Sequence, residues 1–114
     1  MLYETLFLLA LITTWIIEII IMIALIRLVF HDQSLSTGKI IITGALCTAL
    51  TLPYLWFVLP PFVDAANYPL IGETFVVVTE AGILYLVLGL NPKRAMVCSL
   101  VMNAASYVLG LYLL

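Results

Sequence analysis

Long apolar stretches alternate with short polar segments along this chain. Four stretches reach the length of about 20 residues that a helix needs to cross the hydrocarbon core of a bilayer. They cover about residues 5–30, 39–59, 69–90 and 93–114. Their polar and apolar positions do not alternate as in a membrane β-strand, and each is about twice as long as such a strand. The pattern predicts an all-α integral membrane protein with a single transmembrane domain, residues 1–114.

The connections between these stretches are short and contain helix-breaking residues. Residues 31–38 join the first two stretches, Pro60 and Pro61 end the second, and Asn91 and Pro92 follow the third. Helices joined by such short loops pack as antiparallel neighbours. We therefore expect a four-transmembrane-helix antiparallel bundle.

The composition excludes several classes of protein. Hydrophobic residues make up 66% of the chain and charged residues 9%, and the mean hydropathy is +1.30. Soluble domains are nearer half apolar and a quarter charged. The chain has only four lysines and arginines, too few for the basic patch that nucleic-acid binding needs. A soluble enzyme, a disordered chain and a nucleic-acid binder are thus excluded, and the expected surroundings are the lipid bilayer.

The basic residues predict the orientation. All four lysines and arginines flank the first and third connections: Arg27, Lys39, Lys93 and Arg94. The positive-inside rule then places these two loops in the cytoplasm and both termini on the extracytoplasmic side of the cell membrane. Aromatic side chains gather near the predicted outer interface, as in an aromatic belt: Trp56, Phe57, Phe62, Tyr68 and Tyr112.

The second and fourth stretches carry small and polar residues at the same spacing. The two series are Lys39, Gly44, Thr48 and Thr51, and Arg94, Ser99, Asn103 and Ser106. One interpretation is a parallel two-plus-two internal repeat about an axis along the membrane normal. The alternative is that such spacing only packs membrane helices closely. On that second interpretation, the helix-packing residues are Gly44, Ser99, Ser106 and Gly110.

Polar groups from all four stretches fall at a similar depth. Glu18, Glu80 and Asn103 each lie about 15–18 Å along the helix axis from the nearest predicted interface, and Thr48 and Thr51 fall at a similar level. Lipid cannot satisfy such groups, so we expect them to face the protein interior or an oligomer interface. Glu73 shares a helix face with Glu80, about 10 Å away along the axis. The candidate ion-binding residues are Glu18, Glu73, Glu80, Asn103, Thr48 and Thr51.

These residue types favour a transporter or channel for protons or small cations. Buried carboxylates either hold a cation or take up a proton, and carboxylate, amide and hydroxyl oxygens suit hard cations. Four helices of this size are expected to enclose little space, so a path between protomers, and hence a homo-oligomer, is predicted. The alternative is a non-catalytic structural or assembly subunit of a larger membrane complex, with these polar groups serving only packing.

An enzyme that acts on lipid substrates within the membrane is the least favoured hypothesis. The chain contains no GxGxxG, P-loop, HExxH or GxSxG pattern, so no cofactor and no catalytic residue is predicted. Only His31 and Asp32 would fit such chemistry, and a lone histidine at this position is more typical of a helix end. Cys47 and Cys98 lie in apolar runs, and we expect them to be buried as small apolar side chains.

Overall fold

A computed structural model describes residues 2–64 and 66–113, in which every regular element is helical. Three of the four long helices continue into a π-helical turn, in which backbone hydrogen bonds join residues five positions apart. The elements are α1 (Tyr3–Ala24) with its turn η1 (Leu25–Val29), α2 (Thr37–Pro53) with η2 (Tyr54–Val58), the 3₁₀ turn η3 (Pro60–Phe62), α3 (Tyr68–Ile83) with η4 (Leu84–Leu88), and α4 (Pro92–Leu113).

Four of these helical segments are long and apolar enough to cross a membrane. They cover Tyr3–Val29, Thr37–Val58, Tyr68–Leu88 and Pro92–Tyr112. Each bound lies within about two residues of the prediction from the hydrophobic pattern. The all-helical character and the four candidate spans predicted from the sequence are therefore confirmed.

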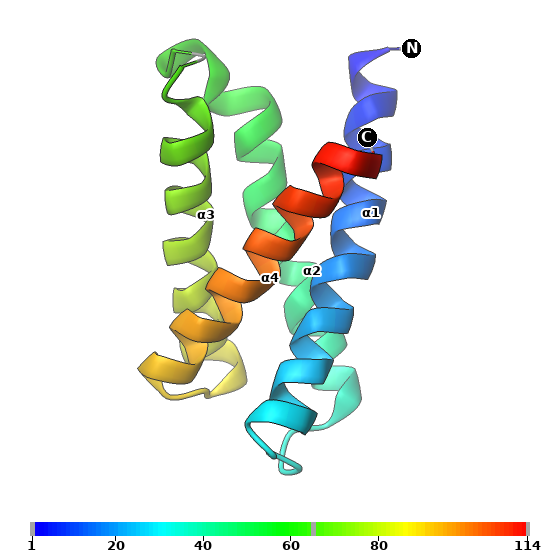
Figure 1. The fold of residues 1–114 in the computed structure, drawn as a ribbon, viewed down its shortest axis with the longest axis vertical. Helices are drawn as coiled ribbons and strands as arrows, with labels where there is room; N and C mark the ends of the chain where they lie inside the picture. Colours follow the sequence, from blue (N-terminus) through cyan, green and yellow to red (C-terminus); the bar gives the residue numbers. More distant parts are fainter. Residues whose placement is uncertain (1, 65, 114) are drawn as a thin grey trace.

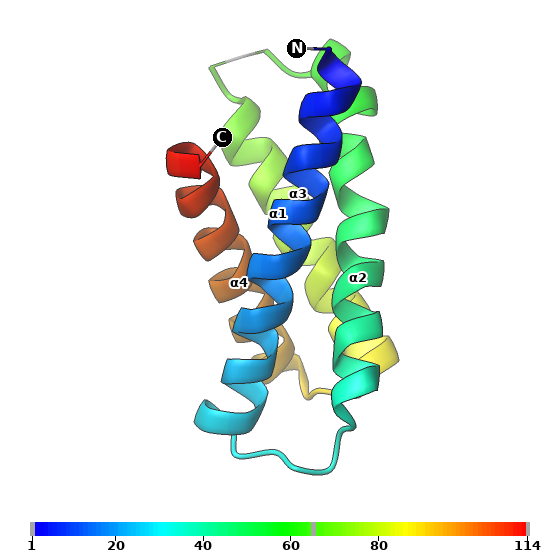
Figure 2. The ribbon, with the colours of Figure 1, turned by 90° about the vertical axis from the view of Figure 1, so that its right-hand side faces the viewer.

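The chain passes back and forth along the long axis of the molecule (Figure 1). The start of α1, the turn η3 and the end of α4 lie toward one end, and the loops before α2 and before α4 lie at the other. We call the first the η3 end and the second the loop end. Contacts join α1 to α2 and α4, and α3 to α4 and α2. Figure 2 shows α1 between α2 and α4, with α3 behind it.

Local signals in the sequence explain where the helices begin and end. The Ser36 hydroxyl accepts a hydrogen bond from the Lys39 amide (3.1 Å), and the Asn91 side chain accepts one from the Arg94 amide (2.8 Å). Such bonds satisfy amides that have no partner in the first turn of a helix. After η4, Gly89 has φ +79°, a left-handed conformation that ends helices and favours glycine.

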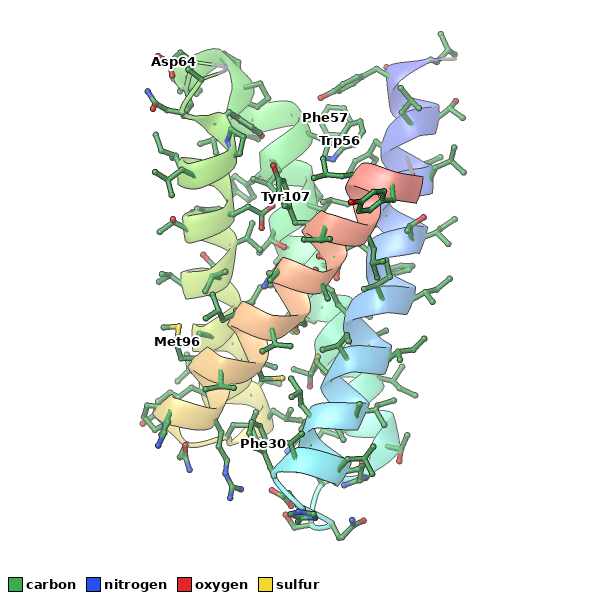
Figure 3. The ribbon with its side chains drawn as sticks, in the orientation of Figure 1. Phe30, Trp56, Phe57, Asp64, Met96 and Tyr107 are labelled. Atoms are coloured by element: carbon green, nitrogen blue, oxygen red, sulfur yellow. The ribbon has the colours of Figure 1, made fainter. Side chains whose placement is uncertain are left out.

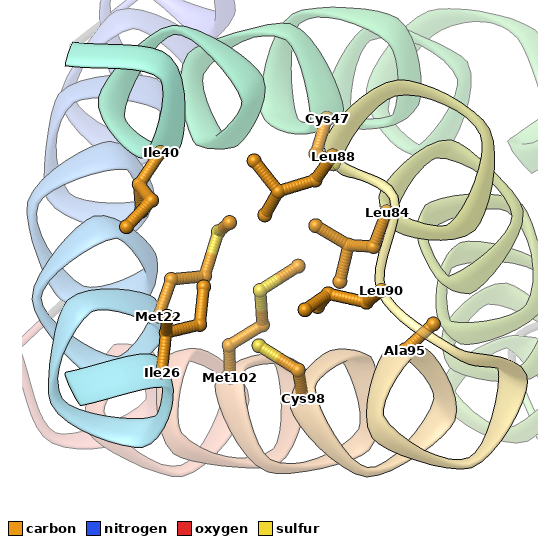
Figure 4. Close-up of a cluster of buried hydrophobic side chains, with 10 residues drawn as sticks. All are labelled: Met22, Ile26, Ile40, Cys47, Leu84, Leu88, Leu90, Ala95, Cys98 and Met102. Carbon is orange, nitrogen blue, oxygen red and sulfur yellow. The ribbon is translucent and has the colours of Figure 1, made fainter. Parts of the chain in front are cut away.

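A dry apolar core fills the loop end of the bundle (Figure 4). All four helices contribute to it, together with the loop before α4. Its buried members are Met22, Ile26, Ile40, Cys47, Leu84, Leu88, Leu90, Ala95, Cys98 and Met102. Both cysteines are buried free thiols, as expected from their apolar surroundings in the sequence. This half of the molecule is thus closed by close-packed side chains.

Small residues set the spacing between helices at two contacts. A Cβ on Gly44 would lie 2.9 Å from Ile19 Cγ1 and 3.2 Å from Met22 Sδ, so α1 and α2 approach closely there. The Ser99 hydroxyl of α4 donates to the carbonyl of Val77 in α3 at 2.7 Å. Both residues therefore lie at contacts between helices.

Gly110 does not have the packing position expected for it. A Cβ there would meet no described atom within 4 Å. The reason is the course of α4, which crosses the bundle obliquely (Figure 1) and leaves a cavity beside its final turns. Gly110 lines that cavity instead of closing a contact between helices.

Candidate ion-binding site

Two glutamates lie at the centre of a polar layer in the middle of the bundle. Glu18 comes from α1 and Glu80 from α3, and their side chains are only 2% and 1% exposed. Lipid would leave such groups without partners, and the predicted inward orientation of both is confirmed by their burial. Asn103 of α4 is equally buried, at 2% exposed.

Each glutamate receives hydrogen bonds from both α2 and α4. Glu18 accepts from the Thr48 hydroxyl at 3.4 Å and from the Ser106 hydroxyl at 2.8 Å. Glu80 accepts from the Thr51 hydroxyl at 2.7 Å and from the Asn103 amide nitrogen at 2.9 Å. All four carboxyl oxygens therefore have a protein partner, and the layer joins all four helices.

The two carboxyl groups line the same cavity, and neighbouring turns of α2 and of α4 donate to both of them. Glu18 and Glu80 thus form a pair, which we call the carboxyl pair. The sequence had suggested Glu73, on the same helix face, as the companion of Glu80.

The first half of the chain (α1 and α2) and the second half (α3 and α4) make equivalent hydrogen bonds in this layer. Thr48 on α2 donates to Glu18 on α1, and its counterpart Asn103 on α4 donates to Glu80 on α3. The other two bonds each join a helix of one half to the glutamate of the other half. Thr51 on α2 donates to Glu80, and Ser106 on α4 donates to Glu18. The residue series with equal spacing therefore occupy equivalent places around the carboxyl pair.

Each hydroxyl of the layer also lies within hydrogen-bonding distance of a carbonyl on its own helix. Thr51 is 2.8 Å from the carbonyl oxygen of Cys47, and Ser106 is 3.1 Å from that of Asn103. Thr48 is 3.3 Å from the carbonyl oxygen of Gly44. A hydroxyl carries one proton, so at any moment each of these groups donates either to a carboxyl group or to its own helix.

A cavity of about 420 Å³ extends from the carboxyl pair toward the η3 end. Tyr3, Trp56 and Tyr68 line its outer part, and Figure 3 shows Trp56 and Tyr107 above the middle of the bundle. The sequence-based expectation that four helices enclose little space is therefore wrong for this half of the molecule. The dry core closes the opposite half, so among the described residues this cavity opens away from the loop end.

The lining of this cavity carries acidic but no basic side chains among the described residues. Glu18 and Glu80 form its floor, and the half-buried Glu73 lies on its wall nearer the η3 end. A second groove of about 460 Å³ runs along α3 and α4, and Glu73, Asn103 and Tyr107 line both spaces. The cavity therefore approaches the apolar outer surface of the bundle between these two helices.

At the loop end, charged side chains hold the backbone instead of forming a site. Arg27 donates to the carbonyl oxygen of Asp32 at 2.7 Å and to that of Leu35. The hydroxyl and amide of Ser34 donate to the Asp32 carboxylate at 2.6 and 2.8 Å, which holds the pKa of Asp32 below its usual value. His31 adopts φ 54° at the end of the first span. His31 and Asp32 therefore belong to the loop before α2 and lie away from the carboxyl pair.

Most of the candidate residues chosen from the sequence meet in this layer. Thr48, Thr51, Glu18, Glu80 and Asn103 lie together, whereas Glu73 lies apart on the cavity wall. The sequence predicts a packing role for Ser106, and the structure adds a hydrogen bond to Glu18. Ser106 occupies the same place in the fourth stretch as Thr51 in the second, and this equivalence indicates a role in the polar layer.

The aromatic lining of the cavity was the part that the sequence did not reveal. The sequence predicts an interfacial belt that includes Trp56 and Tyr68, and it gives no signal for Tyr107. No group of three or more His, Cys, Asp or Glu side chains in the described part of the chain is placed to hold a metal ion. Comparisons of the chain with protein families, curated proteins and solved structures found no match.

Proposed function

We propose that this chain is an antiparallel four-helix membrane protein that binds a proton or a small cation at the carboxyl pair and exchanges it through the cavity. The observation that carries the proposal is the position of the pair. Two buried glutamates from different helices lie at the floor of one cavity with no basic side chain among its described lining residues.

The energetic argument supports a bound positive charge. A charged side chain at the bilayer centre costs about 2.5–3.5 kcal/mol even on the milder insertion scales. Two neighbouring carboxylates would add mutual repulsion. A shared proton or a cation removes one of these charges, so the pair is stable inside the bundle only when it holds one.

The proposed orientation assigns the cavity to one side of the membrane. With Arg27, Lys39, Lys93 and Arg94 in the cytoplasm, the η3 end and the mouth of the cavity face outward. The dry core then separates the carboxyl pair from the cytoplasm. Movement of an ion across the membrane requires that core to open, so this conformation corresponds to the state loaded from outside.

A flux measurement in liposomes tests the proposal. The protein is reconstituted with an internal pH dye, and a proton or cation gradient is applied to the wild type and to Glu80→Gln. Glutamine keeps the shape and a hydrogen-bond acceptor but holds no charge, so we expect flux to fall to the level of empty liposomes. The matched control is Glu4→Gln, which removes an exposed acid outside the cavity. Wild-type flux in Glu80→Gln would contradict the proposal.

A second candidate function is that of a structural or assembly subunit. It is favoured by the observation that no buried side-chain nitrogen or oxygen in the described residues lacks a hydrogen-bond partner, so the polar layer can serve as an internal clamp. Under this hypothesis Glu80→Gln leaves every measured flux unchanged, while Glu80→Leu fails to fold. Purification in mild detergent adds a further test, since other chains that co-purify favour the subunit and a defined homo-oligomer does not.

A further inference from the structure

The size and chemistry of the cavity exceed what a proton requires. Its volume of about 420 Å³ lies in the range of about 300–1,000 Å³ that small-molecule sites occupy. Such sites combine an apolar lining with a few polar groups that converge on one point. Here the convergent groups are Glu18 and Glu80 at the floor, and the wall includes Leu52, Leu55 and Val76.

The charges of the lining select the sign of a ligand. Glu18, Glu73 and Glu80 line the cavity, and no lysine, arginine or histidine is among the described lining residues. An anion would be repelled by these acidic groups and would find only neutral hydroxyl and amide donors among the described lining residues. A cation would meet a carboxyl group both at the floor and on the wall.

Four aromatic residues surround the path from the η3 end to the carboxyl pair: Tyr3, Trp56, Tyr68 and Tyr107. The rings of Tyr3 and Trp56 lie against each other with centroids 5.0 Å apart. Aromatic faces attract cations, and aromatic cages recognise quaternary ammonium groups. A bare metal ion gains little from such walls, whereas an organic cation with an apolar body fits both the rings and the acids.

The groove between α3 and α4 offers a second approach for an apolar ligand. Apart from Glu73, Thr74 and Asn103, its lining consists of apolar or aromatic residues: Pro69, Leu70, Val77, Val78, Leu100, Ala104 and Tyr107. In the proposed membrane setting this groove faces the acyl chains. An amphipathic cation dissolved in the outer leaflet would therefore meet Glu73 before it reached the carboxyl pair.

We propose that the cavity binds a hydrophobic organic cation of the quaternary or protonated amine class. The ammonium group lies between Glu73 and the carboxyl pair, and the apolar body lies among the aromatic residues. The inference rests on the proposed function, because the ligand and the proton would compete for the same carboxyl pair. Binding of the cation to a protonated pair would release the proton toward the η3 end, so that total charge is conserved.

Tryptophan fluorescence gives a direct test, because the chain has two tryptophans and only Trp56 lines the cavity. Trp15 donates to the carbonyl of Ala45 between α1 and α2, and Trp15→Phe leaves Trp56 as the sole reporter. The probe is benzyltrimethylammonium, compared with its neutral carbon isostere neopentylbenzene. We expect saturable quenching by the cation and binding of the isostere weaker by about tenfold or more. Calorimetric titration of the wild-type chain provides the same comparison without the Trp15 substitution.

Matched variants separate the site from partitioning of the probe into detergent. Glu73→Gln and Glu80→Gln should each weaken cation binding by about tenfold or more, since each removes a desolvated charge partner. Glu4→Gln should leave it unchanged. Equal binding of the neutral isostere, or no effect of the glutamine variants, would overturn the inference and identify the cavity as a place for acyl chains.

Different results would refute the proposed function and the organic-cation site. If Glu80→Gln abolishes flux in liposomes while the wild type does not bind benzyltrimethylammonium, the organic-cation site is refuted and ion exchange at the carboxyl pair stands. If the probe binds and depends on Glu73 and Glu80 while no flux is seen, the cavity is supported as a ligand site and ion exchange is refuted.

Discussion

The close contact of α1 and α2 at Gly44 yields a quantitative prediction. A Cβ at this position would lie 2.9 Å from Ile19 Cγ1 and 3.2 Å from Met22 Sδ. Overpacking of this kind costs about 1–3 kcal/mol, whereas replacing glycine by alanine inside a helix gains about 1 kcal/mol. We therefore expect Gly44→Ala to lower the free energy of unfolding by up to about 2 kcal/mol.

The matched control is Gly82→Ala in α3. A Cβ at Gly82 would meet no described atom within 4 Å, so this variant keeps the gain in helix propensity and pays no packing cost. The two variants should therefore differ by about 1–3 kcal/mol. The measurement is equilibrium unfolding in mixed micelles with increasing dodecyl sulfate, followed by circular dichroism. A Gly44→Ala protein as stable as Gly82→Ala would refute the close approach of α1 and α2.

The same substitution should disturb the polar layer. Gly44 lies one helical turn from Thr48, whose bond to Glu18 is already long at 3.4 Å. If the added methyl group moves α1 away from α2, this bond is the first to break. Flux in liposomes should then fall in Gly44→Ala and stay at the wild-type level in Gly82→Ala.

Three further predictions concern orientation, the loop and the contact between α3 and α4. In a chain without other cysteines, an impermeant thiol reagent added outside should label Ala66→Cys and not Ser36→Cys, because the proposed orientation places the basic loops in the cytoplasm; the reverse pattern would invert the proposed topology. Ser34→Ala should raise the pKa of Asp32 toward its usual value in an NMR titration, since the serine supplies a hydroxyl donor to this carboxylate. Loop stability from these bonds is present at neutral pH and is lost as the pH falls through the lowered pKa of Asp32, and an unchanged pKa would contradict the contact. Ser99→Ala should lower the free energy of unfolding by about 0.6 kcal/mol, and by about 1.7 kcal/mol at most, because hydrogen bonds between membrane helices contribute stability of this size. No measurable loss would contradict a stabilising bond from Ser99 to α3.

The depth of the polar layer could be predicted from the sequence because the rise of a helix is fixed at about 1.5 Å per residue. Counting from each predicted interface placed Glu18, Glu80 and Asn103 at one level, and these residues are buried together. The cost of an exposed carboxyl group in lipid then predicted that they face inward. Both steps use properties that hold for any membrane helix.

The pairing of Glu18 with Glu80 and the cavity could not be predicted in the same way. Lipid and protein core are equally apolar, so the apolar pattern of a membrane helix does not show which face points inward. The oblique course of α4 opens the space beside Gly110, and it depends on contacts such as the bond from Ser99 to Val77. Such contacts are fixed only when all four helices are placed together.

Three hydroxyl groups in the polar layer can each donate either to a carboxyl group or to a carbonyl of their own helix. This choice determines how a change in the charge of the carboxyl pair would be observed. When the carboxyl pair loses a proton, Thr48, Thr51 and Ser106 can turn from the carbonyls of their own helices toward the carboxylates. Each hydroxyl oxygen already lies within hydrogen-bonding distance of both acceptors, so only the O–H bond turns and no helix axis moves. Two structures that differ by this proton would then have the same backbone, and the stretching vibration of the carboxyl C=O bond would distinguish them.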